Sequence, residues 1–286
     1  MIQDIAPDRL DNAYLPGNPQ PEDTILLFDE EGRLYISARD EQLRFPTGKD
    51  VPGESAVYLF SVNKERYFLA PEKTGITLPG YEYRTIRELR DMGQGKELFA
   101  AFTAWHLWKW YTDNRFCGRC GHKNGLHPAE RALQCQSCGQ VIYPRINPAV
   151  IVGVIRRDSL LITRYRSGFA HNALVAGFTE IGETLEQTVA REVMEETGVR
   201  VRNIRYYKSQ PWGMAQDLLT GFYCEAEGEG TIHMDTGELK YAEWVPRAEI
   251  VLQPNNLSLT NEMMMQFRDH GRKMLTWENR DGEVLC

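Results

Sequence analysis

Short apolar runs separated by polar turns fill the first part of this chain, and they predict β-hairpins. Residues 24–29 and 33–37 flank one polar turn, and residues 56–62 and 66–70 flank another. Residues 1–23 are instead rich in proline, aspartate and asparagine, so we expect an irregular arm there. The pattern therefore predicts a small sheet near the start of the chain.

From Pro148 onward, apolar runs and apolar residues at helical spacing alternate in a new order. Residues 149–155 and 159–165 predict a hairpin around a polar Arg-Arg-Asp turn. Other elements are predicted by the same criteria, with strands at 217–225 and 240–245 and helices at 94–113, 184–198 and 260–274. The order of strands and helices is typical of an α+β domain.

The predicted helix at 184–198 has clear end signals. Thr184 and Gln187 are spaced as a capping box at its start, and Gly198 is the residue type that ends helices in the left-handed conformation. Apolar residues recur at every fourth position and should face a core, namely Leu185, Val189 and Val193.

Three carboxylates, at Glu192, Glu195 and Glu196, gather on a second face of this helix. Like charges so close destabilise a bare helix, whereas divalent cations would neutralise them. Such cations clamp pyrophosphate oxygens, stabilise transition-state charge and acidify a bound water. We therefore interpret this face as a metal platform for attack on a P–O–P bridge. The alternative is a solvated acidic helix without a ligand.

Four cysteines are spaced as in a zinc ribbon. Two residues separate Cys117 from Cys120 and Cys135 from Cys138, and fourteen residues lie between the pairs. Four thiolates at this spacing suit tetrahedral Zn²⁺ in a closed, structural site. A glycine follows each second cysteine and allows a tight turn in which backbone amides face the sulfurs. Two disulfides, or thiols without a role, are the alternatives.

Composition favours a cytoplasmic protein outside the membrane. The opening residues lack the apolar core of a signal peptide, and no run of about 18 apolar residues occurs. A reducing compartment favours zinc over disulfides. We expect Cys224 to be a strand residue and Cys286 to be a free C-terminal thiol. The net charge of −7 argues against a dedicated nucleic-acid binder, so the ribbon is expected to be structural.

Residues 177–199 resemble the signature of the Nudix hydrolases. They read Gly177, five residues, Glu183, seven residues and then the sequence Arg-Glu-Val-Met-Glu-Glu-Thr-Gly-Val. With the ribbon and the later sequence Ser209-Gln210-Pro211-Trp212, residues 84–286 are similar to the NADH pyrophosphatase subfamily. The resemblance implies a metal-dependent pyrophosphohydrolase that cleaves NADH or NAD⁺ to nicotinamide mononucleotide and AMP. In bacterial relatives this activity extends to removing NAD caps from RNA 5′ ends.

The same resemblance implies an α+β fold, in which a Nudix αβα sandwich with a mixed sheet follows a zinc ribbon and a small N-terminal α+β domain. We place these parts at 144–286, 114–143 and 1–113. Mg²⁺ or Mn²⁺ is the expected catalytic cofactor, beside one structural Zn²⁺ per chain. The expected partners are an NAD(H)-type dinucleotide, NAD-capped RNA and a second copy of the chain in a homodimer.

Catalytic roles are also implied by the resemblance. The metal ligands would be the backbone carbonyl of Ala176 and the side chains of Glu192, Glu195, Glu196 and Glu238. Glu183 would pair with Arg191 and hold the helix to the preceding loop. Either Glu195 or Glu196 would act as the general base.

Substrate contacts are implied at several further positions. Phe178 would stack on the nicotinamide-side or cap base, and Tyr143 would contact substrate, although each ring, judged alone, is more often a core residue. Arg84, Glu130 and Thr260 match positions that line the pocket. The remaining contacts would come from one loop, namely Gln210, Pro211, Trp212, Gly213, Met214, Ala215, Gln216 and Asp217.

This loop departs from the subfamily directly after Trp212. Relatives usually continue with Pro-Phe-Pro-x-Ser, whereas residues 213–217 read Gly-Met-Ala-Gln-Asp. A flexible glycine thus replaces a rigid proline, and Met214, a softer surface for a base, replaces an aromatic ring. The loop must differ in shape, which keeps ADP-ribose and dinucleoside polyphosphates open as substrates. A catalytically silent NAD or ADP-ribose sensor is the alternative outside the enzymes, but every box glutamate is present.

Overall fold

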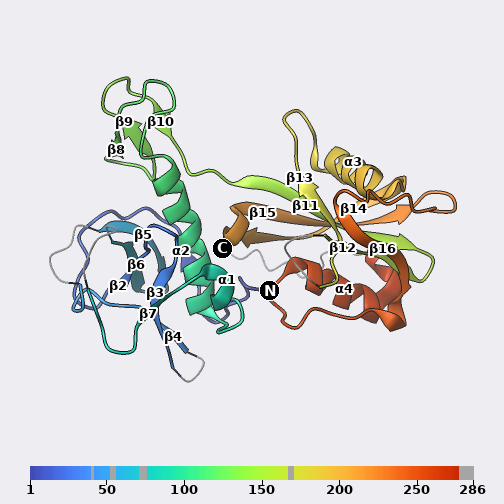
Figure 1. The fold of residues 1–286 in the computed structure, drawn as a ribbon, viewed down its shortest axis with the longest axis horizontal. Coiled ribbons are helices and arrows are strands. Elements are labelled where there is room, and N and C mark those ends of the chain that lie inside the picture. Colours follow the sequence, from blue (N-terminus) through green and yellow to red (C-terminus); the bar gives the residue numbers. More distant parts are fainter. Residues whose placement is uncertain (40–41, 52–55, 71–75, 167–170, 277–286) are drawn as a thin grey trace. The chain divides into compact units, whose positions relative to one another are not determined.

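Internal contacts divide the chain into two units (Figure 1). The computed structural model describes residues 1–39, 42–51, 56–70, 76–166 and 171–276. The C-terminal unit comprises Met1, Asn147–Pro211 and Asp217–Cys286, and the N-terminal unit comprises Ile2–Ile146 and Trp212–Gln216. Cys286, expected to be a free thiol, lies outside the described residues. The three-part division at 113/114 and 143/144 stays a prediction.

A six-stranded mixed sheet forms the centre of the C-terminal unit. Its order is β14-β15-β11-β12-β16, and β13 also pairs with β11. β11 and β15 are parallel, whereas β12 and β13 pair antiparallel with β11. The bounds are β11 Asn147–Arg156, β12 Ser159–Tyr165, β13 Val175–Phe178, β14 Val201–Trp212, β15 Asp217–Ala226 and β16 Leu239–Pro246. The hairpin predicted around residues 156–158 is confirmed as β11–β12.

Alternating residues of β11 face two different helices. Val150 and Val152 pack in one core with Val193 of α3 (Leu185–Thr197), and Ile151 packs in the other with Phe267 of α4 (Leu259–His270). Burying each such side chain stabilises the fold by roughly 1.5–3 kcal/mol. Because neighbouring residues of a strand point to opposite faces, the two sets of contacts place one helix on each face of the sheet. Figure 1 shows α3 and α4 on opposite sides of it. The predicted αβα sandwich with a mixed sheet is therefore confirmed.

The N-terminal unit contains two small sheets and the ribbon, with orders β1-β5-β6-β2, β4-β3-β7 and β10-β9-β8. The hairpin predicted at 56–70 is confirmed as β5–β6. The helix predicted at 94–113 is α2 (Lys96–Asp113), which follows the short α1 (Ile86–Leu89). The strand bounds are β1 Leu10–Asp11, β2 Thr24–Leu26, β3 Leu34–Arg39, β4 Gln42–Arg44, β5 Val57–Val62, β6 Glu65–Leu69, β7 Glu82–Arg84, β8 Asn124–Leu126, β9 Leu133–Cys135 and β10 Val141–Ile142.

Two predictions for this unit were wrong in part. Residues 24–37 do form a turn, closed by the bridge between Phe28 and Leu34, but the flanking strands then diverge. β2 pairs in parallel with β6, and β3 pairs with β4 and β7. The arm expected to be irregular contributes β1, which pairs with β5. Both differences come from pairing between segments distant in sequence, which a local pattern does not report.

The later part of the C-terminal unit also differs from expectation. β14 was not predicted, and it carries Ser209-Gln210-Pro211-Trp212, which we expected in a loop. The helix predicted at 260–274 is α4, and a 3₁₀ segment at Gly271–Thr276 continues it. Across the described ranges, no helix has the length and apolar character needed to span a membrane.

Candidate functional site

Helix α3 begins and ends at the predicted residues. The Thr184 side chain accepts a hydrogen bond from the Gln187 backbone N–H at 3.3 Å, and the Gln187 side chain accepts one from the Thr184 N–H at 2.8 Å. Gly198 ends the helix with a φ of 67°. These two caps fix the helix boundaries and therefore the positions of its glutamates.

Arg191 connects the helix to the loop before it. Its guanidinium donates to both oxygens of Glu183, at 2.6 and 2.9 Å, and to the backbone carbonyl of Phe178 at 3.0 Å. It also donates to Glu192 at 2.7 Å and to Glu195 at 3.0 Å. The Arg191 hydrogen bonds lower the pKa of Glu183 to about 2, so this pair stays charged at neutral pH. The contacts match the role that the resemblance implies for Glu183 and Arg191.

Glu196 is a buried carboxylate, with 2% of its surface exposed. The Tyr165 hydroxyl lies 3.0 and 3.3 Å from its two oxygens and accepts a hydrogen bond from the Ala176 N–H at 3.1 Å. Burial, with repulsion from Glu192 and Glu238, raises the pKa of Glu196 to about 8, although the Tyr165 hydrogen bond opposes the shift. Tyr165 thus joins Glu196 to the backbone of Ala176. Both Glu196 and the Ala176 carbonyl are predicted metal ligands.

The predicted side-chain ligands influence one another electrostatically. Burial raises the pKa of Glu192, and the charges of Glu195 and Glu238 raise it further. Glu238, directly before β16, therefore lies close to the α3 glutamates although it is 42 residues beyond Glu196 in the sequence. Gly177 approaches Glu192 so closely that a Cβ there would overlap the carboxylate. The structure thus brings the box residues and Glu238 together.

This donor set fits a hard divalent cation, because only oxygen ligands are present and their mutual repulsion needs a positive partner. Unlike the four cysteines, these glutamates do not form a tight group of ligand atoms within the described residues. The individual ligand roles stay predictions.

Three residues of the C-terminal unit that are predicted to contact the substrate differ in how far they are exposed. Phe178 is 53% exposed at the end of β13, which excludes the core alternative for this ring. Thr260 is half-buried in the first turn of α4. Gln210 is fully buried, and its amide bonds the backbones of Leu257 at 2.8 Å and Leu259 at 2.7 Å. The Gln210 side chain therefore positions the start of α4.

Residues 212–216 pack within the N-terminal unit. The Trp212 ring meets Phe102 edge-on at 5.6 Å, and the Arg90 guanidinium lies 5.5 Å from the same ring. A Cβ on Gly213 would overlap the carbonyl oxygen of Phe102 in α2. The expectation that Gly213 makes the loop flexible was therefore wrong, because it permits close packing. The other predicted contact residues nearby differ in exposure. Pro211 and Ala215 are exposed, Met214 is half-buried and Gln216 is buried.

Asp217, predicted as part of the loop, is the first residue of β15 and is 6% exposed. Burial raises its pKa to about 7, although a hydrogen bond from the Asn147 side chain opposes the shift. Its Oδ1 has no hydrogen-bond partner among the described residues. In β11, Asn147 pairs with Asp217, and Ala149 pairs with Phe178. Residues two positions apart in a strand point to the same face, so Asp217 and Phe178 project from the same face of the sheet.

The remaining substrate candidates lie in the N-terminal unit. The exposed Tyr143 donates its hydroxyl hydrogen to Glu130 at 2.7 Å. The Arg84 guanidinium donates to Glu82 at 2.9 Å and to Glu88 at 3.2 Å. The structure therefore brings Tyr143 and Glu130 together and engages Arg84 with two acids, while their substrate roles stay predictions.

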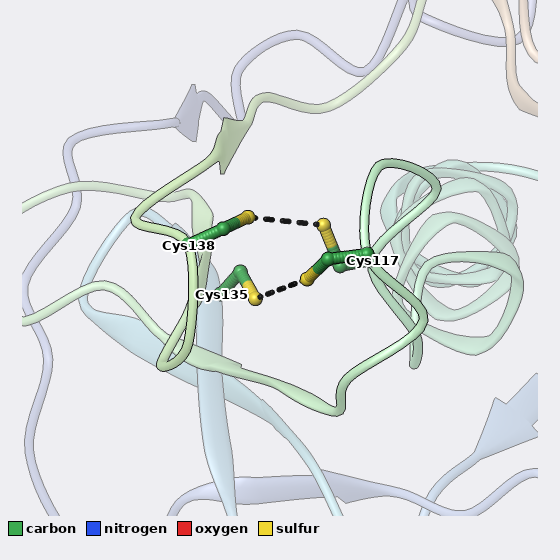
Figure 2. Close-up of side chains that lie close together, drawn as sticks. Cys117, Cys135 and Cys138 are labelled. Carbon is green, nitrogen blue, oxygen red and sulfur yellow. Dashed lines mark hydrogen bonds between the residues drawn. The ribbon is translucent and has the colours of Figure 1, made fainter.

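The four cysteine sulfurs lie within 4.8 Å of one another. Figure 2 shows the side chains of Cys117, Cys135 and Cys138 pointing toward one another. Sulfur–sulfur distances are 3.7 Å for Cys117 and Cys138 and 3.5 Å for Cys120 and Cys135. Backbone N–H groups of Cys138 and Ser137 lower the pKa of Cys135 to about 6, which favours a thiolate at this one sulfur. The predicted knuckle turns form, since Gly121 and Gly139 have φ values of 75° and 74°. This geometry fits a structural Zn²⁺.

Tyr165 is the residue that sequence reasoning missed. Its only sign in the sequence was its position as a tyrosine, an aromatic residue with a polar hydroxyl, at the end of the predicted strand 159–165. Its partner Glu196 lies 31 residues away, and only the packing of β12 near α3 brings the two together.

Comparisons with known proteins agree with this geometry. Residues 145–267 match the NUDIX domain family, and residues 113–143 match the NADH pyrophosphatase zinc ribbon domain. Similar curated relatives include the NAD-capped RNA hydrolases NudC of Klebsiella pneumoniae and Shigella flexneri. They are 33% and 34% identical over 232 residues, which cover 77% of this chain and 87% of each relative.

Among solved structures, a NUDIX hydrolase from Nitrosomonas europaea has a TM-score of 0.49 at 20% identity, covering 56% of this chain and 93% of that one. The curated relatives and the two domain matches establish the family. The chain belongs to the Nudix hydrolases, in the family of the NAD-capped RNA hydrolases NudC, and it carries an NADH pyrophosphatase zinc ribbon domain.

Proposed function

We propose that this chain is a metal-dependent pyrophosphohydrolase that cleaves NADH or NAD⁺ to nicotinamide mononucleotide and AMP and removes NAD caps from RNA 5′ ends. The observation that carries the proposal is the gathering of Glu192, Glu196 and Glu238 in one unit with the exposed ring of Phe178. The curated relatives are NAD-capped RNA hydrolases, which supports this substrate class.

Mg²⁺ or Mn²⁺ is the proposed catalytic cofactor, and the oxygen-only donor set supports this choice. The residues that would hold it are the Ala176 carbonyl, Glu192, Glu195, Glu196 and Glu238. When bound, such ions supply positive charge to the phosphate oxygens and acidify a bound water.

The chain's own residues would orient the reaction. Water attacks one phosphorus of the P–O–P bridge and the other phosphate leaves, so one phosphoanhydride becomes two phosphate monoesters. Glu195 or Glu196 accepts the proton of the water. Arg191 orients the first of these carboxylates from 3.0 Å, and Tyr165 orients the second from 3.0 Å. A positioned base of this kind contributes about 10²–10⁴-fold to a rate.

Phe178 is proposed to stack on the nicotinamide-side base. Its exposed ring follows Gly177 directly, which brings the base next to the glutamate cluster. Stacking of a base on an aromatic side chain contributes about 1–3 kcal/mol and tolerates different bases. The ring therefore favours a nucleotide substrate without selecting one base.

A second candidate within the enzyme class acts on ADP-ribose or a dinucleoside polyphosphate. The packing of residues 212–216 on α2, through Trp212 and Gly213, favours it, because this segment has its own shape in this chain. The silent sensor has no such support, since Glu183, Arg191 and the α3 glutamates are all present, and Arg191 pairs with Glu183 and Glu195.

The test is to incubate the purified chain with NADH and either Mg²⁺ or Mn²⁺ and to measure AMP release. A panel of NAD⁺, ADP-ribose, diadenosine polyphosphates and NAD-capped RNA then ranks kcat/KM among substrates. Turnover of NADH or NAD-capped RNA above the others supports the proposal. Absence of turnover on the whole panel would exclude the enzyme.

We also propose a cytoplasmic location and a homodimer. A four-thiolate zinc site is kept reduced in the cytoplasm, which supports the first. The family resemblance supports the second, and light scattering of the purified chain tests it. A mass of one chain at micromolar concentration would exclude the dimer.

A further inference from the structure

A pocket of about 500 Å³ lies in the C-terminal unit, outside the residues assigned to catalysis. Its lining residues come from the segment after β12 and from the chain leading into β16, namely Arg166, Met234, Thr236, Leu239 and Lys240. Pockets that bind small ligands commonly measure about 300–1,000 Å³. This one therefore has room for a group as large as a nucleotide.

Three contacts place the pocket next to the glutamate cluster. The Arg166 backbone N–H donates to the Glu238 carbonyl at 3.0 Å. The Asp235 N–H donates to the backbone carbonyl of Glu196 at 2.8 Å, so the segment with Met234 and Thr236 lies along the end of α3. Tyr165, the neighbour of Arg166, bonds the Glu196 carboxylate at 3.0 Å. A ligand bound in the pocket would thus lie beside the reacting phosphates.

Two cations of this pocket have no carboxylate partner among the described residues. Arg166 donates from Nη1 to the Thr236 carbonyl at 2.9 Å, which holds the guanidinium in place and leaves further N–H donors. Within the described parts of the chain, neither Arg166 nor Lys240 forms an ion pair. By contrast, Arg191 pairs with three carboxylates. Uncompensated cations on a pocket wall, in a chain of net charge −7, indicate an anion that arrives from solution.

We propose that this pocket is a subsite for the nucleotide that follows the NAD cap in a capped RNA. Its phosphodiester binds between Arg166 and Lys240, and the attached nucleoside packs against the half-buried Met234. The inference rests on the proposed function, because the glutamate cluster takes the hydrolysed diphosphate and a third phosphate needs cations of its own. Free NADH has no third phosphate, whereas NAD-capped RNA has one on the adenosine 3′ oxygen.

The test compares two substrates in the full-length protein. Arg166→Gln, Lys240→Gln and the double variant are assayed for kcat/KM on NADH and on a short NAD-capped RNA at several salt concentrations. Lys273→Gln is the matched control, since Lys273 is an exposed lysine of the same unit outside the pocket.

We expect the double variant to lose about tenfold in kcat/KM on capped RNA and less than about twofold on NADH. The salt dependence on RNA should weaken by about 0.7 log units per log unit of salt for each lost phosphate contact. Lys273→Gln should behave as the wild type on both substrates. An equal loss on both substrates, or no loss on RNA, overturns the subsite.

If the proposed function is wrong, the wild type itself hydrolyses neither NADH nor capped RNA, whereas a wrong subsite leaves the wild-type activity intact. If the wild type hydrolyses neither substrate, the subsite is still tested by fluorescence anisotropy of labelled NAD-capped RNA with Ca²⁺ in place of the catalytic metal. About tenfold weaker binding by the double variant than by Lys273→Gln supports the subsite. Equal binding by both variants overturns it.

Discussion

The hydroxyl of Tyr165 lies 3.0 Å from Oε1 of Glu196 and accepts a hydrogen bond from the backbone of Ala176. One phenol therefore holds a buried carboxylate and the strand that contains the box glycine. Because a buried carboxylate without a partner is costly, this contact defines where Glu196 can place its oxygens.

Tyr165→Phe removes the hydroxyl and keeps the ring. A bound cation would ionise Glu196, and losing a hydrogen bond to a buried charged group costs about 1.5–3 kcal/mol, so we expect kcat to fall by about 10- to 100-fold with weaker Mn²⁺ binding. Steady-state kinetics and Mn²⁺ titration by electron paramagnetic resonance measure the two effects.

Tyr241→Phe is the matched control for that variant. The Tyr241 hydroxyl also bonds a carboxylate, Glu243 at 3.1 Å, but in an exposed pair on β16. It should retain wild-type kinetics and metal affinity. Equal metal affinity in Tyr165→Phe and wild type would remove Tyr165 from the site.

The two candidate bases can be separated by amide substitutions. Glu196→Gln keeps the shape of a side chain at the centre of the cluster, and we expect it to lose about 10²–10⁴-fold in kcat. Glu195→Gln changes an exposed carboxylate held by Arg191, and we expect a smaller loss. Circular dichroism and zinc content should match the wild type in both. A larger loss in Glu195→Gln would assign the base to Glu195.

Asp217 predicts a pH-dependent stability. Its pKa is about 7 in the folded chain and about 3.9 when unfolded, so the unfolded state releases this proton first. Stability from this group is therefore present below about pH 4, falls as pH rises to about 7 and stays low above that. Asp217→Asn should stabilise the chain at pH 8, by up to a few kcal/mol, and by about a third as much at pH 5, where the unfolded carboxyl is already ionised and the folded one is not.

Urea unfolding at the two pH values measures this difference. Asp91→Asn, at an exposed aspartate, is the control and should show no pH-dependent gain. An equal gain for Asp217→Asn at pH 5 and pH 8 would contradict the assigned cause, which is the burial of a charge.

If the four cysteines bind zinc, replacing one of them should lower both the zinc content and the thermal stability of the chain. Cys135→Ser removes one of four thiolates, and we expect the bound zinc to fall well below one per chain and the melting temperature to decrease, because metal binding contributes to folding. Cys224→Ala, at a buried cysteine outside the group, should retain its zinc. Elemental analysis and thermal unfolding measure both variants, and full zinc content in Cys135→Ser would refute the site.

Gly213→Ala tests the packing of the altered loop. The new methyl group would overlap the Phe102 carbonyl, and overpacking of this kind costs about 1–3 kcal/mol. Gly17→Ala, where a Cβ meets no atom within 4 Å, is the control. Denaturant unfolding compares the two, and equal stability would show that the loop can move away from α2.

Local chemistry explains what could be predicted from the sequence. The caps at Thr184 and Gly198 and the spacing of the glutamates lie within one helix, so α3 and its carboxylate face followed directly from residue types. The cysteine spacing likewise predicted a group that the structure brings within 4.8 Å.

Long-range packing explains what could not be predicted. β14 lies at the edge of the sheet with few buried residues, so it has no apolar run to mark it. The partnership of Tyr165 with Glu196 depends on strand β12 lying near α3, and that of Gly213 with Phe102 joins segments more than 100 residues apart. Neither contact has a signature in its own neighbourhood.

The tight approach at Gly177 and at Gly213 also limits how this protein could be altered. Any side chain at Gly177 would displace Glu192, and any at Gly213 would displace the backbone of α2. Mutant libraries aimed at a new nucleotide specificity should therefore leave both glycines untouched. Diversity is better tolerated at the neighbouring Met214 and Ala215, which are half-buried and exposed.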